Sequence, residues 1–365
     1  MRFVCCSSLE SNTMSLKDFD ALLLLSFGGP EGNDEVIPFL ENVTRGRGIP
    51  KERLEKVGEH YFHFGGVSPI NGQNLEIAEQ LRAVLKARGH ELPVYFGNRN
   101  WHPFAEDTAR EMSEAGHRNI LVFATSAWGG YSACRQYDED IARLHQAHPE
   151  LHFTKLWQFY AHPTFVRLTG DFLKQAVASI DSKELSTTRI LFSAHSIPTA
   201  ADKAAGGHDD PNLYSRQVLE ASKLVAEHAG VHSYENVWQS RSGDPRTPWL
   251  EPDIVDRVKE LRQEDVTHII CVPIGFLTDH MEVVWDLDTE LKAACDELGI
   301  ALTRVSTIGL EPKFAEMIVD IAECISQGTT PPTLSTTTVQ GCTENGTPCH
   351  VDCCASIRPR PHKQL

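Results

Sequence analysis

The sequence lacks the features that would mark a membrane, secreted or nucleic-acid-binding protein. No apolar run approaches the roughly 18 residues that a membrane-spanning helix needs, and residues 1–14 contain no apolar stretch like that of a secretory signal. Ten cysteines in 365 residues are too few for a disulfide framework. Basic residues are also scarce, 34 against 50 acidic ones, so the net charge of −16 disfavours an anionic partner. We therefore expect a cytoplasmic protein with no nucleic-acid partner and no stable membrane insertion.

A glycine-rich phosphate loop is missing as well. The stretch FGGPEG at 27–32 follows an apolar run, but its glycines do not have the spacing of either nucleotide-binding fingerprint. The sequence also contains no internal repeat. These absences leave a globular protein that binds a cation or a small ligand.

Short apolar runs alternate with amphipathic stretches of helical length. This pattern is typical of α/β folds in which helices cover both faces of a parallel sheet. The expected strands are 21–27, 94–98, 119–127, 189–196 and 267–276. We expect two such α/β units in the chain.

Composition suggests how the chain is divided. The two domains are expected at 15–160 and 161–308, after a disordered N-terminal extension over 1–14. A helix over 309–328 is expected to pack back on the first domain. It is followed by a Thr- and Pro-rich linker at 329–341, too poor in apolar residues to fold alone, and by a cysteine-rich tail at 342–365.

Candidate functional residues follow the strands, where open parallel sheets bind their ligands. His195 ends the run LFSAHS, although a single histidine in this position is most often structural. After the run ending at Phe276, an expected helix carries acidic residues three or four positions apart, which would place them in one stripe. The stripe is Asp279, Glu282, Asp286 and Glu290. Such stripes are usually solvated, but this one is interrupted by apolar residues, so a cation or protons are expected to join it.

Six motifs together resemble the ferrochelatase family over about residues 18–328. They are LLLLSFGGP, TRGRGIP, FGGVSPIN, FSAHSIP, WQSRSGDPRTPWLEPD and PIGFLTDHMEVVWDLD. The resemblance implies two Rossmann-like halves, each a four-stranded parallel sheet flanked by helices, and insertion of Fe²⁺ into a porphyrin. The motif GGYSACRQY and the cysteine-rich tail resemble the actinobacterial branch. For that branch the expected substrates are coproporphyrin III and ferrous iron, the product is coproheme, and a [2Fe–2S] cluster is the cofactor.

The resemblance also implies roles for individual residues. His195 and Glu282 are expected to meet the iron and remove the pyrrole protons, and Asp286 to continue the acidic line. The expected porphyrin-binding residues are Phe27, Arg45, Arg47, Ser68, Tyr137 and Trp238. Phe27 stands where some relatives have a tyrosine that can ligate the iron of the product.

The tail is expected to complete the cluster site. The resemblance implies Cys134, Cys342, Cys349 and Cys354 as ligands, with Cys353 as a rival to Cys354. From the residues alone, a structural zinc site or free thiols remain alternatives, because zinc also takes four thiolates.

Other functions stay open at this point. One is a ferrochelatase for protoporphyrin IX, and another is a chelatase that inserts cobalt into a corrinoid precursor. Outside enzymes, the alternative is a haem-binding or iron–sulfur sensor protein, although a carrier gains nothing from the acidic stripe. We expect a monomer that makes transient contacts with other enzymes of haem synthesis.

Overall fold

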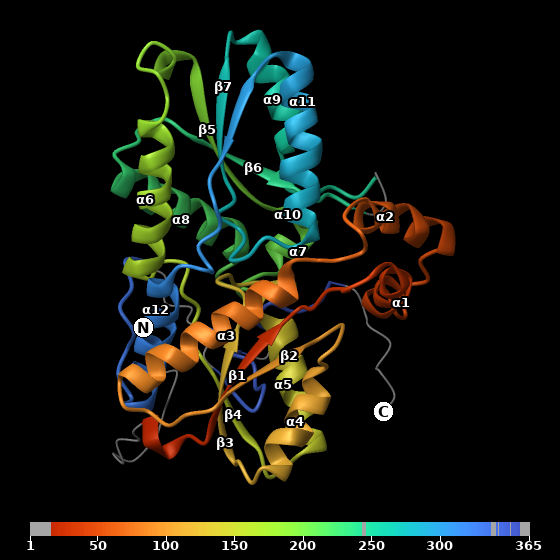
Figure 1. Ribbon diagram of the computed structural model, residues 1–365, viewed down its shortest axis with the longest axis vertical. Helices are drawn as coiled ribbons and strands as arrows, with labels where there is room; N and C mark the ends of the chain where they lie inside the picture. Colours follow the sequence, from red (N-terminus) through yellow and green to blue (C-terminus); the bar gives the residue numbers. More distant parts are fainter. Residues whose placement is uncertain (1–15, 243–245, 337–340, 342, 351, 358–365) are drawn as a thin grey trace.

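The computed structural model describes residues 16–242, 246–336, 341, 343–350 and 352–357. The expected extension over 1–14 and the expected ligand Cys342 lie outside the described residues. The described chain forms two α/β units, one above the other in Figure 1, each built on a sheet of parallel strands. The predicted fold class is therefore confirmed.

The first sheet has the strand order β2-β1-β3-β4-β9. Its strands are β1 (Ala21–Ser26), β2 (Val94–Asn98), β3 (Asn119–Ala124), β4 (His152–Lys155) and β9 (Thr343–Glu344). The first four are parallel, whereas β9 comes from the cysteine-rich tail and pairs antiparallel with β4. The prediction of four strands was therefore one short for this sheet, because the two residues of β9 are too few to give a strand pattern.

The second sheet has four parallel strands in the order β6-β5-β7-β8. They are β5 (Thr188–His195), β6 (Glu235–Gln239), β7 (His268–Val272) and β8 (Ala301–Arg304). The sequence did not reveal β4, β6 and β8, which are four or five residues long and carry polar side chains. The other strands were predicted to within a few residues.

Helices cover both faces of each sheet. They are α1 (Asn33–Val43), α2 (Lys51–His63), α3 (Ile70–Ala87), α4 (Ala105–Glu114), α5 (Gln136–Ala147), α6 (Pro163–Ala178), α7 (Thr199–Lys203), α8 (Leu213–Ala229), α9 (Ile254–Gln263), α10 (Met281–Trp285), α11 (Lys292–Leu298) and α12 (Pro312–Ser326). None of the helices among the described residues is long and apolar enough to cross a membrane.

Strand β1 is buried on both faces, which explains its four consecutive leucines. Alternate side chains of a strand point to opposite faces. Leu22 and Leu24 pack with α3, while Leu23 and Leu25 pack with α4 and α5. All four are fully buried, and burying each contributes roughly 1.5–3 kcal/mol. The strand therefore forms the rigid centre of the first domain.

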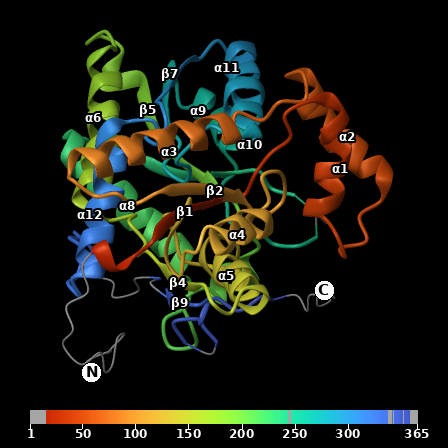
Figure 2. The same cartoon turned by 60° about the horizontal axis from the view of Figure 1, so that its bottom comes forward.

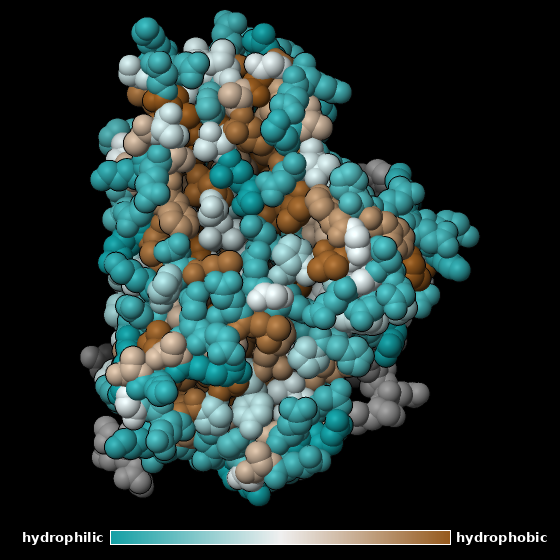
Figure 3. Space-filling model, in the orientation of Figure 1, coloured by the Kyte–Doolittle hydropathy of each residue, from teal (hydrophilic) through white to brown (hydrophobic). Residues whose placement is uncertain are grey.

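Helices α1 and α2 stand away from the first sheet, as Figure 2 shows. Their contact is built on Val36, Phe39 and Leu54, and α2 also contacts α10 of the second domain. Brown apolar residues gather over this pair in Figure 3, and α2 leaves Val57 and Phe62 exposed. The pair thus borders the strand ends of both sheets.

The predicted acidic stripe is wrong in one respect. The helix begins only at Met281, and a π-helical turn follows over Asp286–Leu291. Asp279 therefore lies before the helix, where Arg304 binds it with an N–O distance of 3.2 Å. The wider π turn also breaks the α-helical spacing on which the prediction relied.

Candidate active site

His195 and Glu282 face each other from separate elements of the second domain. His195 is the last residue of β5, and Glu282 is the second residue of α10. The distance from Nε2 of His195 to Oε2 of Glu282 is 3.5 Å. The side chains keep 35% and 51% of their exposure, so the pair is open to a ligand. The structure thus brings together the two residues that the sequence set apart for chemistry.

Both partners are held by the backbone around them. Nδ1 of His195 contacts the carbonyl oxygen of Ser196, so Nδ1 carries a hydrogen and donates it. The hydroxyl of Tyr214 donates to the carbonyl oxygen of His195 at 2.8 Å. Glu282 is positioned at the start of α10, where its N–H donates to Nδ1 of the N-cap residue His280. Consequently Nε2 is the nitrogen of His195 that faces the carboxylate.

Each member of the pair shifts the pKa of the other, so that the pKa of His195 rises and that of Glu282 falls. Desolvation by the surrounding protein lowers the pKa of His195, but the Glu282 carboxylate outweighs this effect and raises it to about 9. Desolvation raises the pKa of Glu282, and His195 lowers it to about 2 overall. At neutral pH without substrate, the pair is therefore an imidazolium beside a carboxylate.

Asp286 is the neighbouring ionisable group. Burial is the main cause that raises its pKa to about 7, and the nearby Glu282 and Glu290 carboxylates add to it. Ser240 donates a short hydrogen bond to Asp286, and Gln239 at the end of β6 approaches it at 3.4 Å. Asp286 can thus exchange a proton close to neutral pH.

The first domain contributes aromatic rings to the same region. Tyr61 of α2 lies near enough for Glu282 to raise its pKa further, although burial is the larger cause. His60 stacks on Trp285 with ring centroids 4.0 Å apart. Sequence analysis missed Tyr61, His60 and His280. The motif TDHMEVV contained His280 beside Glu282, but no sequence signal placed α2 against α10.

The predicted porphyrin-binding residues are spread over several settings. Phe27 follows β1 with 38% exposure, and Ser68 lies buried against the turn at Gly29. Arg45 and Arg47 are exposed after α1.

Tyr137 and Trp238 are buried instead. Tyr137 lies beneath the Arg99 guanidinium, whose central carbon is 4.3 Å from the ring centroid. Trp238 packs beside Tyr214 in the core. The structure brings neither of them to an exposed surface.

The thiols of the tail lie beside the first domain. Cys353 and Cys354 are buried, with their sulfur atoms 3.7 Å apart. Cys134, in the π-helical turn Tyr131–Arg135, interacts electrostatically with Cys349 and Cys354. Among the described residues, no three His, Cys, Asp or Glu side chains are grouped so that they could hold a metal ion.

Comparison with known proteins identifies the family. The ferrochelatase family model matches residues 19–324. The chain belongs to the ferrochelatase family. It is thus an enzyme, a metal chelatase of the lyase class, and its place in haem and porphyrin biosynthesis follows.

Individual relatives agree with this assignment. The coproporphyrin III ferrochelatase of Corynebacterium diphtheriae is 52% identical, over 96% of this chain and 98% of the relative. That of Nocardia farcinica is 49% identical, over 93% of this chain and 97% of the relative. A solved structure of SirB from Bacillus subtilis with Fe³⁺ has a TM-score of 0.50 at 13% identity, covering 86% of this chain and 99% of that one. The last likeness supports the fold alone.

Proposed function

We propose that this ferrochelatase-family enzyme inserts Fe²⁺ into coproporphyrin III and produces coproheme. The observation that carries the proposal is the His195–Glu282 pair, which combines an anionic metal ligand with an imidazole that can act as a base once iron displaces its proton, at an open strand end. Relatives at about half identity are named coproporphyrin III ferrochelatases, which favours this porphyrin over protoporphyrin IX.

The chemistry follows from the charges of the pair. Ferrous iron is a dication, so its approach to Glu282 lowers the proton affinity of His195. The imidazolium then releases its Nε2 proton to solvent water, and the lone pair on Nε2 becomes available to accept a proton from a pyrrole nitrogen. Glu282 offers the carboxylate oxygens that balance the charge of the arriving iron. Two pyrrole protons leave as the metal enters, and Asp286, with its pKa of about 7, can relay them.

The macrocycle would be held mainly from the first domain. Phe27 offers an exposed ring to a flat ligand, and Ser68 supports the adjoining turn. Arg45 and Arg47 can pair with propionates, because guanidinium binds carboxylate through two hydrogen bonds. Tyr137 would act from within the first domain and Trp238 from within the second, since both are buried.

One turnover assay tests this assignment. Anaerobic reactions with ferrous iron should consume coproporphyrin III faster than protoporphyrin IX. Glu282→Gln keeps the shape of the side chain but removes its charge, and it should reduce turnover at saturating porphyrin. Glu264→Gln, on the surface after α9, is the matched control. Equal turnover of both porphyrins would overturn the substrate assignment, and an unchanged rate in Glu282→Gln would remove this residue from the mechanism.

We further propose that the tail binds a [2Fe–2S] cluster through Cys134, Cys342, Cys349 and Cys354. Such a cluster divides four thiolates between two irons, so it does not need the three-residue grouping that a single ion requires. Cys354 is favoured over Cys353 because its sulfur accepts backbone N–H groups from Gly130 at 3.2 Å and Gly206 at 3.3 Å.

The acidity of the thiols supports the same choice. Hydrogen bonding from Cys353 lowers the pKa of Cys349 and Cys354, and the same contacts raise the pKa of Cys353. Thiolates are the form that binds iron, so the acidity of Cys349 and Cys354 fits the cluster. Burial raises the pKa of Cys134 to about 12, so this thiol would lose its proton only as iron binds, beside the ammonium of Lys155.

The purified protein should be red-brown and contain iron and sulfide in equal amounts. Cys349→Ser should lose both, whereas Cys324→Ser, far from the tail thiols in sequence, should keep them. Colourless protein that contains zinc would decide for a structural zinc site instead.

We also propose a cytoplasmic monomer that contacts other enzymes of haem synthesis only transiently. The net charge of −16 favours a protein that stays dispersed. Light scattering of the purified protein should give the mass of one chain. A stable dimer would contradict this proposal.

A further inference from the structure

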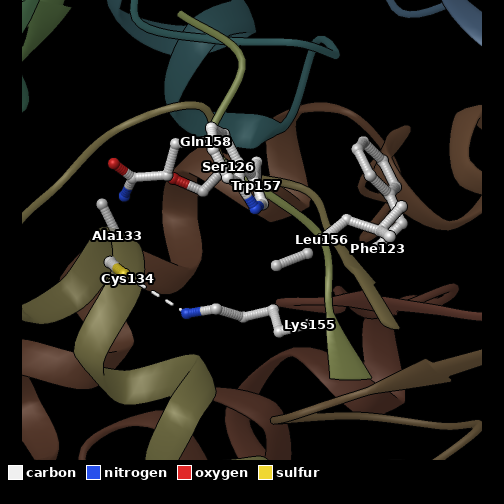
Figure 4. Close-up of a pocket in the computed structure, with 9 residues that line it drawn as sticks. Phe123, Ser126, Ala133, Cys134, Lys155, Leu156, Trp157 and Gln158 are labelled. Atoms are coloured by element: carbon white, nitrogen blue, oxygen red, sulfur yellow. Dashed lines mark hydrogen bonds between the residues drawn. The ribbon is translucent and has the colours of Figure 1, made fainter. Parts of the chain in front are cut away.

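A buried lysine lies beside Cys134 and has no role in the proposed iron insertion. Lys155 ends β4, and its side chain is only 3% exposed. Its Nζ donates to the sulfur of Cys134 at 3.3 Å, as the dashed line in Figure 4 shows. A second, short hydrogen bond joins Nζ to Oδ1 of Asp138. A small cavity bordered by Cys134 and Lys155 adjoins this contact.

Three elements converge on this lysine. Cys134 belongs to the π-helical turn and Asp138 to the first turn of α5. Thr343 of the tail strand β9 lies directly opposite Lys155 in the sheet, and its hydroxyl donates to the same Oδ1 of Asp138 at 2.8 Å. The tail is thus attached to the fold at the carboxylate that also binds the lysine.

Burying the Lys155 ammonium costs free energy unless a nearby anion compensates its charge. Removing a lysine and an aspartate from water costs several kcal/mol per ion, and their attraction often only offsets this cost. The carboxylate of Asp138 already balances one charge. A further N–H of the ammonium donates to the sulfur of Cys134. Structural pairing with Asp138 alone does not require that contact.

We infer that Lys155 is a positioning residue that stabilises the cluster-bound thiolate of Cys134 and raises the reduction potential of the cluster. The inference rests on the proposed [2Fe–2S] cluster. A cluster with four thiolates is an anion, and one-electron reduction makes it more negative without breaking a bond. A fixed positive charge at hydrogen-bond distance therefore favours the reduced form. Asp138 acts in the opposite direction and keeps Lys155 oriented.

Substitution of either charge tests this inference in the full-length protein as purified. The measurement is a redox titration with a chemical reductant and mediators, followed by absorbance or electron paramagnetic resonance. Lys155→Met should make reduction at least tenfold less favourable, a shift of about 59 mV to more negative potential for one electron. Asp138→Asn should shift the potential to more positive values. Opposite signs distinguish charge compensation from a loosened structure, which would move both variants in the same direction.

Two further variants keep the test decisive. Lys155→Met combined with Asp138→Asn removes both charges and avoids an unpaired buried carboxylate, and its potential should lie between those of the single variants. Lys259→Met removes a surface lysine that pairs with Asp256 in the second domain, and it should leave the potential unchanged. Wild-type potentials in both charge variants would overturn the inference while leaving the cluster proposal intact. Wild-type protein without iron and sulfide would overturn the cluster proposal itself.

Discussion

The carboxyl ends of the two sheets are built from different chemistry. In the first sheet, the ends of β1 and β2 carry a buried network of neutral side chains, in which Asn74 donates to Ser26 at 2.8 Å and Asn98 donates to Asn71 at 3.1 Å. The charged groups nearby, Lys155 and Arg99, are buried in ion pairs with Asp138 and Asp140. In the second sheet, the corresponding edge carries His195 beside Glu282, both partly exposed.

The neutral network of the first sheet has a structural role, whereas the charged pair of the second sheet has a chemical one. The neutral network satisfies buried polar groups without adding charge, and it holds the turn after β1 in place. The charged pair instead is partly exposed, so a substrate can take the place of His195 beside Glu282 or of Glu282 beside His195. The parallel strands of the two sheets follow the same order but have unequal tasks.

The largest effect is expected at the charged edge. His195→Ala should reduce turnover by roughly 100-fold to 10,000-fold, because it removes the base that accepts the pyrrole proton. Thermal melting should change little, since the side chain is partly exposed. Near-normal turnover would show that the charged edge is not the reactive one.

The segment that joins the two sheets contains the buried His162, and we expect this residue to make the stability of the fold depend on pH. Burial lowers the pKa of His162 to about 4. Below pH 6.5 the unfolded chain binds a proton that the folded chain does not bind until about pH 4. Stability should therefore fall as the pH drops through this range, by up to about 3 kcal/mol. Urea unfolding at a series of pH values measures this loss.

The matched variant is His162→Asn, which can still cap α6, where the imidazole accepts the N–H of Thr164. This variant should lose less stability between pH 6.5 and 4. The same acid sensitivity in both proteins would assign the effect to other groups.

Disruption of the neutral network at the ends of β1 and β2 should lower the free energy of unfolding more than it lowers the turnover rate. Asn98→Ala removes donors to Asn71 and to the carbonyl oxygen of His102. The carbonyl oxygen of His102 keeps a donor in Asn71, but leaving the buried Oδ1 of Asn71 unpaired costs about 1–3 kcal/mol, measurable by urea unfolding. Turnover per folded molecule should stay within a few-fold of wild type. If turnover fell as far as in His195→Ala, the division between the two edges would be wrong.

The smallest effect is expected at Asp279, which lies outside the reactive pair. It binds Arg304, which also binds Asp288. Asp279→Asn should cost no more than about 1 kcal/mol of stability, as expected for a partly exposed pair, and should leave turnover unchanged. A loss of turnover comparable with that in Glu282→Gln would restore Asp279 to the acidic line.

Much of the fold could be predicted because its signals are local. The leucines of β1 alternate between two helical layers, and this gives an apolar run that can be read directly. Strands β4, β6 and β8 could not be predicted in the same way. They are short and only partly buried, and they form by pairing with neighbouring strands, so their sequences become strands without a pattern of their own.

The candidate site was predictable in part for the same reason. The position of His195 after a strand and the carboxylates after Phe276 pointed to one edge of a sheet, and the structure brings Glu282 to His195. The error at Asp279 arose because α-helical periodicity was extended across a segment that starts later and widens into a π turn. A period of 3.6 residues predicts a shared face only while the helix is uniform.

The sequence by itself determined the alternating α/β plan, the strand-end histidine and the crowded thiols, since each depends on residues close together in the chain. Only the tertiary structure decided that α2 borders Glu282, that Gly130 and Gly206 donate to Cys354, and that Lys155 lies against Cys134. These contacts join segments far apart in the chain. Their geometry is set by strand register and helix packing, which no local pattern of residues encodes.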